Sequence, residues 1–148
     1  MKRMNSMMAL LAVLVIMFAA SCSKDNSVAP AAATATSTTT EVDLKQPAPG
    51  NYKIAKFIDT GDDETAQFNG YVFTFSANGA LKVTTGSGQV FNGSWSLNSA
   101  QTIMTLNIAG NNALDDLDDD DWQVIKITNK NIKITKNGPD SVFFTRIP

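Results

Sequence analysis

The sequence feature that most constrains the fold is an alternation of apolar and polar residues with a period of two. In residues 91–97, aromatic, glycine and aliphatic positions alternate with Asn and Ser, and residues 71–75 and 104–108 follow similar patterns. Successive side chains of a strand point to opposite faces, so this period predicts half-buried β-strands. No segment after residue 22 carries a comparable helical period. The pattern therefore predicts an all-β domain.

Turn-forming residues divide this region into separate runs. Asn78-Gly79, Gly86-Ser87-Gly88 and Asn137-Gly138 are examples of Gly- and Asn-rich breaks that favour tight turns. Counting the runs between the breaks predicts eight strands, over residues 51–59, 68–76, 80–85, 89–97, 103–108, 122–128, 132–135 and 141–147.

The short connections favour antiparallel neighbours in sequence order. Eight such strands remove their unpaired edges by closing into an up-and-down β-barrel over residues 50–148. A two-sheet β-sandwich is the alternative architecture. A barrel of eight strands is just wide enough to hold packed side chains or one small ligand.

Residues 22–49 have a different composition. Residues 31–40 contain only Ala, Thr and Ser, and large apolar side chains are scarce throughout the segment. Such a composition does not bury enough apolar surface to offset its ordering entropy. We therefore expect residues 22–49 to form a flexible tether.

Residues 1–21 have the three parts of a secretion signal. Lys2 and Arg3 are basic, residues 7–20 are apolar, and small residues precede Cys22. The apolar run is shorter than the roughly 20 residues that a spanning helix needs. The run Ala19-Ala20-Ser21-Cys22 resembles a lipobox, which implies cleavage before Cys22 and acylation of that residue. Two or more acyl chains anchor a protein durably to a membrane.

The residues after the lipidation position indicate a location. Position 23 is Ser rather than Asp, so the usual signal for retention in the inner membrane is missing, and we expect the outer membrane. Residues 23–25 partly resemble the export tag of surface-exposed lipoproteins. The periplasmic and surface-facing orientations both stay open.

The folded region resembles the short lipocalin-like (calycin-type) lipoproteins of Gram-negative bacteria. Residues 73–75 resemble the family's aromatic strand, residues 91–97 its Gly-x-Trp-x-Leu strand and residues 122–125 its second Trp strand. Residues 50–52 stand where lipocalins often carry Gly-x-Trp, with Tyr in place of Trp. Arg146 stands where they often carry an Arg that packs over that aromatic.

The resemblance implies two groups of residues. Tyr52 and Arg146 would close the barrel by stacking, since a guanidinium lies well on an aromatic ring. The aromatic residues of the interior would contact a small apolar ligand or fill the core instead: Phe73, Phe75, Phe91 and Trp95.

Residues 115–121 form the strongest charge cluster, with six of the fourteen acids of the chain. Oxygen-rich loops can bind Ca²⁺, but the EF-hand pattern of alternate acids, Gly and a distal Glu is missing. A solvated loop between strands is the other interpretation. Residues 62–64 form a smaller acidic cluster in the expected first hairpin.

Composition argues against several functions. The chain has no His, and its single Cys is the expected lipidation site, so we expect no enzyme, no cofactor and no metal held by His and Cys; whether residues 115–121 bind Ca²⁺ stays open. The net charge is −2 and becomes −4 when Lys2 and Arg3 leave with the signal, which argues against nucleic acid as a partner. The resemblance to lipocalins implies a membrane-anchored binder of a small apolar ligand, and we expect this function. The alternative is a structural or inhibitor-type lipoprotein with a packed barrel that contacts another envelope protein.

Overall fold

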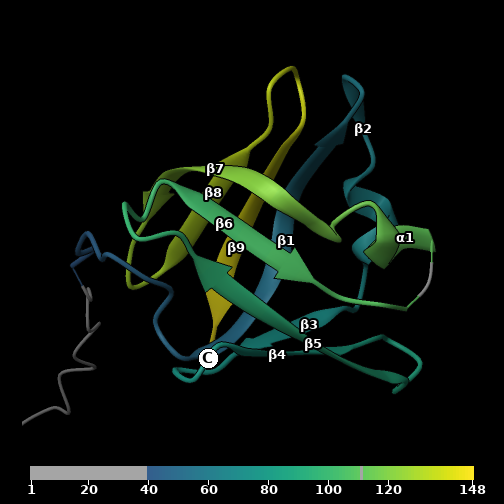
Figure 1. Cartoon of the computed structure of the whole chain (residues 1–148). Coiled ribbons are helices and arrows are strands. Elements are labelled where there is room, and N and C mark those ends of the chain that lie inside the picture. Colours follow the sequence, from purple (N-terminus) through teal and green to yellow (C-terminus); the bar gives the residue numbers. More distant parts are fainter. Residues whose placement is uncertain (1–39, 111) are drawn as a thin grey trace, which may run out of the picture. The chain divides into compact units, whose positions relative to one another are not determined.

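Nine antiparallel strands form one sheet that closes on itself through pairing of β1 with β9 (Figure 1). The computed structural model describes residues 40–110 and 112–148, without the side chain of residue 120. The elements are β1 (Gly50–Asp59), β2 (Asp62–Asp63), η1 (Thr65–Phe68), β3 (Val72–Phe75), β4 (Ala80–Thr84), β5 (Val90–Leu97), β6 (Ile103–Asn107), α1 (Asn112–Asp115), β7 (Asp119–Ile127), β8 (Asn131–Thr135) and β9 (Ser141–Ile147).

The strand order is that of an up-and-down barrel. From β3 to β9, each strand pairs with the next strand along the chain, and β1 joins β3 to β9. The two-residue β2 pairs with the far end of β1 as an additional strand. The predicted all-β, eight-stranded antiparallel barrel is therefore confirmed, and the sandwich alternative is excluded.

Two stretches differ from the expected strand positions. Phe68 ends the single 3₁₀ turn of η1, and β3 begins only at Val72. Between them lies Gly70 with a φ of 79°, and a Cβ at this position would stand 3.0 Å from the Gly86 Cα. This left-handed, crowded backbone favours glycine and interrupts the strand. The other difference is the acidic cluster of residues 115–121, which we expected as a loop between strands. Its first residue belongs to α1 and its last three begin β7.

The core consists of the inward-facing residues of the alternating strands. Its largest fully buried side chains are aromatic and come from β1, β3, β7 and β9: Trp122, Tyr52, Phe57, Phe73, Phe75 and Phe144. Inward and outward residues alternate as the period of two predicts. The alternation slips at irregularities between Ile54 and Lys56 and between Val124 and Lys126.

The antiparallel order gives the barrel two distinct ends. The helix end comprises β2, η1, α1 and the turn of residues 136–140. The strap end comprises the start of β1 and the turns of residues 76–79, 98–102 and 128–130. Phe68, Leu114 and Leu117 are buried in the core at the helix end. The Trp122 Nε1–H donates a 3.1 Å hydrogen bond to the Leu117 carbonyl and fixes this loop on β7.

Residues 40–49, which we call the strap, lie on the barrel (Figure 1). The Leu44 N–H donates to the Ile127 carbonyl at 2.9 Å, Leu44 packs against the core and Pro47 is buried. The strap falls within residues 22–49, the range that composition assigned to a flexible tether. Its placement differs from that expectation because the β7–β8 turn supplies partners for its backbone.

No helix among residues 40–110 and 112–148 is long and apolar enough to cross a membrane.

Candidate functional site

The barrel interior is the first candidate site, because four of its aromatic residues were expected to contact a ligand. Phe73 and Phe75 are fully buried on β3. The Phe144 ring lies edge-on to both, with centroids 5.3 Å from Phe73 and 5.6 Å from Phe75. The Tyr52 ring stands edge-on to Phe75 at 5.3 Å. These rings are at contact distance from one another, so they occupy the space into which they point.

Trp95 and Phe91 lie on β5 but differ in their surroundings. Trp95 is buried, its ring centroid is 6.1 Å from that of Phe75, and its Nε1–H donates to the Ser76 carbonyl at 3.1 Å. Phe91 is half-buried, and a Cβ at Gly110 would stand 2.9 Å from its ring. The structure therefore brings Phe73, Phe75 and Trp95 into one cluster. Phe91 packs against the core from its edge, beside the loop that follows β6.

Three hollows of the described residues lie elsewhere. One of about 540 Å³ is bordered by residues 129–131 and 145–148, and one of about 370 Å³ is bordered by side chains of β1, β8 and β9. A smaller one of about 280 Å³ lies between β6 and the start of β7. None of these three is lined by the four aromatic residues predicted to contact a ligand.

Tyr52 and Arg146 stand opposite each other in the β1–β9 pair that closes the barrel. The Tyr52 ring is fully buried, and its hydroxyl donates to the Ala48 carbonyl at 2.8 Å. The Arg146 guanidinium donates to the Pro49 carbonyl at 2.8 Å, and Gly50 leaves the space for it. Burial raises the pKa of Tyr52, and the nearby Arg146 charge opposes this rise. The two residues thus lie at the closing seam, with Arg146 bound to backbone oxygen.

The described acidic side chains of residues 115–121 do not come together, because members of the cluster contact separate parts of the barrel. Asp118 accepts a 3.0 Å hydrogen bond from the Ile108 N–H, and Asp119 forms an ion pair with Lys136. The Lys136 ammonium also lies 4.8 Å from the Trp122 ring centroid. Among the described residues, no three Asp, Glu, His or Cys side chains converge as a metal site. In the smaller acidic cluster, Asp63 accepts from Lys56 and Thr65, which lowers its pKa to about 2.

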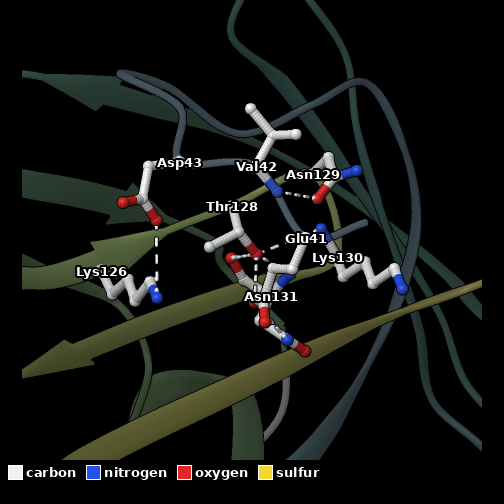
Figure 2. A network of polar contacts seen from close by, with 8 residues as sticks. All are labelled: Glu41, Val42, Asp43, Lys126, Thr128, Asn129, Lys130 and Asn131. Atoms are coloured by element: carbon white, nitrogen blue, oxygen red, sulfur yellow. Dashed lines mark hydrogen bonds and ion pairs between the residues drawn. The ribbon is translucent and has the colours of Figure 1, made fainter. Parts of the chain in front are cut away.

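The strap is held by a network of polar contacts with the β7–β8 turn (Figure 2). The Val42 N–H donates to Asn129 Oδ1 at 2.9 Å, and the Asn129 N–H donates to the Val42 carbonyl at 3.0 Å. Glu41 Oε1 accepts from Thr128 Oγ1 at 2.7 Å and from Asn131 Nδ2 at 2.9 Å. The hydrogen bonds from Asn131 and Thr128 lower the pKa of Glu41.

Sequence reasoning missed the role of the strap, although a signal was present. Val42 and Leu44 alternate with Asp43 and Lys45, which is the period of two found in the strands. The run is short, and it follows a long segment of Ala, Thr and Ser. Asn129 and Asn131 stand in the break between the predicted strands of residues 122–128 and 132–135, and nothing in that break indicates a partner at Glu41 or Val42.

The Cys22 position, the signal of residues 1–21 and the tether up to residue 39 lie outside the described residues.

Comparisons with known proteins give one structural likeness. No protein-family model matches the chain, and no curated protein matches it. Among solved structures, the chain is similar to a DUF4847 family protein from Bacteroides vulgatus, with a TM-score of 0.48 and 13% sequence identity. The match covers 67% of this chain and 92% of that protein. A likeness at this level assigns no function to the chain.

Proposed function

We propose that the protein is an envelope lipoprotein whose solid β-barrel acts through its outer surface, as a structural or inhibitor-type module that contacts another envelope component. The observation that carries this proposal is the packed interior. The rings of Phe73, Phe75 and Phe144 lie against one another, with centroids 5.3 Å and 5.6 Å apart. A ligand cavity usually measures roughly 300–1,000 Å³ and buries most of its ligand.

The closure of both ends supports the same proposal. At the helix end, Leu114 and Leu117 are fully buried, and at the strap end Leu44 packs against the core. An apolar ligand would have to displace these side chains and separate the aromatic rings. Removal of a core aromatic costs about 3–5 kcal/mol, so separating several of them is unfavourable.

The membrane part of the proposal rests on the sequence. The basic start, the apolar run and the small residues before Cys22 support acylation at that residue and a place in the outer membrane. Growth of the source cells with an alkyne-bearing fatty acid tests this part. We expect label in the wild-type chain, recovered with outer membranes, and none in Cys22→Ser. Label in both variants would contradict acylation at Cys22.

Native mass spectrometry of the acylated protein from its own membranes tests the surface-acting function against ligand binding. We expect the mass of the chain and its acyl groups alone. A stoichiometric apolar compound that remains bound would overturn the proposal and restore the small-ligand function. In-cell photo-crosslinking from exposed outer-face positions should then give discrete adducts with an envelope component. Failure of all such positions to give an adduct would also count against the proposal.

A further inference from the structure

Four side chains form a row across the outer surface of the barrel. Lys56 of β1 is in register with Phe143 of β9, Phe143 with Lys133 of β8, and Lys133 with Lys126 of β7. All four occupy outward positions, because their neighbours Phe57, Val142, Ile132 and Ile127 are buried. Adjacent strands are 4.7–4.9 Å apart, so this lysine row is about 15 Å long.

The three lysines of the row are only partly neutralised within the protein. Lys126 and Lys133 stand directly opposite each other, and like charges in this position repel. Lys56 pairs with Asp63 at 2.6 Å and Lys126 with Asp43 at 3.4 Å, but the side chains of both lysines and both aspartates are more than half exposed. Such exposed ion pairs contribute little to the stability of the fold. No carboxylate among the described residues pairs with Lys133. An anion bound at the row would relieve this repulsion.

Apolar groups accompany the cations. The 370 Å³ hollow on this face is lined by Lys56 and Lys133 together with Ile58, Val142 and Phe143. Ile125, next to Lys126 in the chain, is 55% exposed. Phe143 and Ile58 are half-buried and Val142 is buried, so Ile125 is the exposed apolar side chain of this face. Lysines beside accessible apolar side chains are typical of surfaces that bind the interface of anionic membranes.

The strap places this face near the predicted anchor. Asp43 pairs with Lys126 and bridges to Thr128, so the first described residues of the strap lie beside the Lys126 end of the row (Figure 2). Residues 23–39 can span no more than about 60 Å even when fully extended. An acylated chain would therefore hold the row close to the lipid surface at high effective concentration.

We propose that the lysine row is a second membrane contact, in which the Lys56, Lys126 and Lys133 ammonium groups bind the phosphates of an anionic lipid surface. Phe143 and Ile125 then lie against the interface. The inference rests on the membrane anchoring proposed above. It orients the barrel with β7, β8, β9 and β1 on the bilayer and leaves β4 and β5 free for a partner.

The experiment uses the acylated full chain in vesicles that carry a quencher at headgroup depth. Because acylation occupies the single native cysteine, Ile125→Cys gives a unique position for a fluorescent label. Val90→Cys is the matched control, since Val90 is 50% exposed on β5. In vesicles of phosphatidylcholine and phosphatidylglycerol, we expect quenching of the label at position 125 and little at position 90. Equal quenching at the two positions would overturn the inference.

Charge variants test the role of the lysines in the same assay. Each lysine near an anionic surface changes the partition about fivefold, so Lys126→Gln with Lys133→Gln should lower the docked-to-undocked ratio about 25-fold. Lys82→Gln, on the outer face of β4, should leave the ratio unchanged. In the labelled chain that keeps all its lysines, high salt should reduce the quenching at position 125, because salt screens the contact between lysines and phosphates. Quenching that is unchanged by the double variant, or that is equal in phosphatidylcholine alone, would refute the lipid-phosphate contact.

The outcomes separate this inference from the proposal on which it rests. If acylation fails, the chain does not enter vesicles with either label. If the row is not a lipid contact, the anchored chain enters but position 125 stays unquenched. If the fluorescence of the label at position 125 is unchanged by vesicles but changes with soluble polyglutamate, the row binds an acidic protein and the lipid assignment is wrong.

Discussion

The two ends of the barrel are closed by different means. At the helix end, η1 and α1 bring Phe68, Leu114 and Leu117 into the core, and acidic residues lie outside them. At the strap end, closure depends largely on hydrogen bonds between residues 40–44 and the β7–β8 turn. We therefore expect the apolar closure of the helix end to unfold only together with the core, and the strap, which adds Leu44 to its hydrogen bonds, to open locally at lower cost.

The largest effect is expected where the helix end meets the core. Leu117→Ala removes a fully buried side chain, and the free energy of unfolding should fall by about 2–5 kcal/mol because a cavity remains. Chemical denaturation followed by Trp fluorescence measures this change. Val90→Ala, at an exposed position, should change it by less than about 0.5 kcal/mol. If the two variants lose the same stability, the helix end is not part of the packed core.

At the strap end, Asn129→Ala should act locally. It removes the side-chain hydrogen bonds to the Val42 N–H and the Thr40 carbonyl. Two such bonds contribute about 1–3 kcal/mol, so amide exchange of Val42 and Leu44 should accelerate about 5-fold to 150-fold while global unfolding changes less. Asn92→Ala on the outer face of β5 is the control. Uniform acceleration across all strands would contradict the separate behaviour of the strap.

Tyr52→Phe should have a smaller effect at the junction of strap and barrel. The ring stays packed on Phe75, and only the hydroxyl contact with the Ala48 carbonyl is lost. We expect a loss of about 1 kcal/mol in the free energy of unfolding. Because burial raises the pKa of Tyr52, its phenolate should form late in an alkaline titration. A phenol that titrates at its ordinary value would contradict the burial of this ring.

The smallest effect is the pH dependence of the strap. The pKa of Glu41 is lowered by its hydrogen bonds with Asn131 and Thr128. The contribution of Glu41 to the stability of the strap is therefore present when the pH is above 4.5, the ordinary pKa of a glutamate. It disappears as the pH falls through the lower pKa of the folded state. The protection factor of the Val42 amide, which is the intrinsic exchange rate at each pH divided by the measured rate, should fall on acidification in the wild type and much less in Glu41→Gln. An identical response of the two chains would show that the Glu41 carboxylate does not stabilise the strap.

The barrel could be predicted from the sequence because its cause is local. The alternation in residues 91–97 and 71–75 fixes which side chains face inward, and short turns fix the antiparallel order. Phe68 and Gly70 show the limit of this reasoning. Phe68 continues an apolar pattern, but the backbone of Gly70 turns the chain before the strand begins.

Other features depend on residues far apart in the sequence. From the sequence, Asn129 can be identified only as a turn residue, because its partner Val42 lies 87 positions away in the chain. The lysine row likewise exists only in the register of β1, β9, β8 and β7. For the expected ligand site, the sequence placed Phe73, Phe75 and Trp95 inside, but their mutual packing depends on Phe144 and Tyr52.

The most direct test of the packed interior is a titration of the protein with benzene, followed by NMR of core methyl groups. Leu81 and Val142, both fully buried, report on the space around the aromatic cluster. We predict no saturable methyl shifts in the wild type and clear shifts in Phe75→Ala, because an emptied apolar cavity of this kind binds such a probe. Saturable one-to-one binding by the wild-type protein would contradict the central claim that its own side chains fill the barrel.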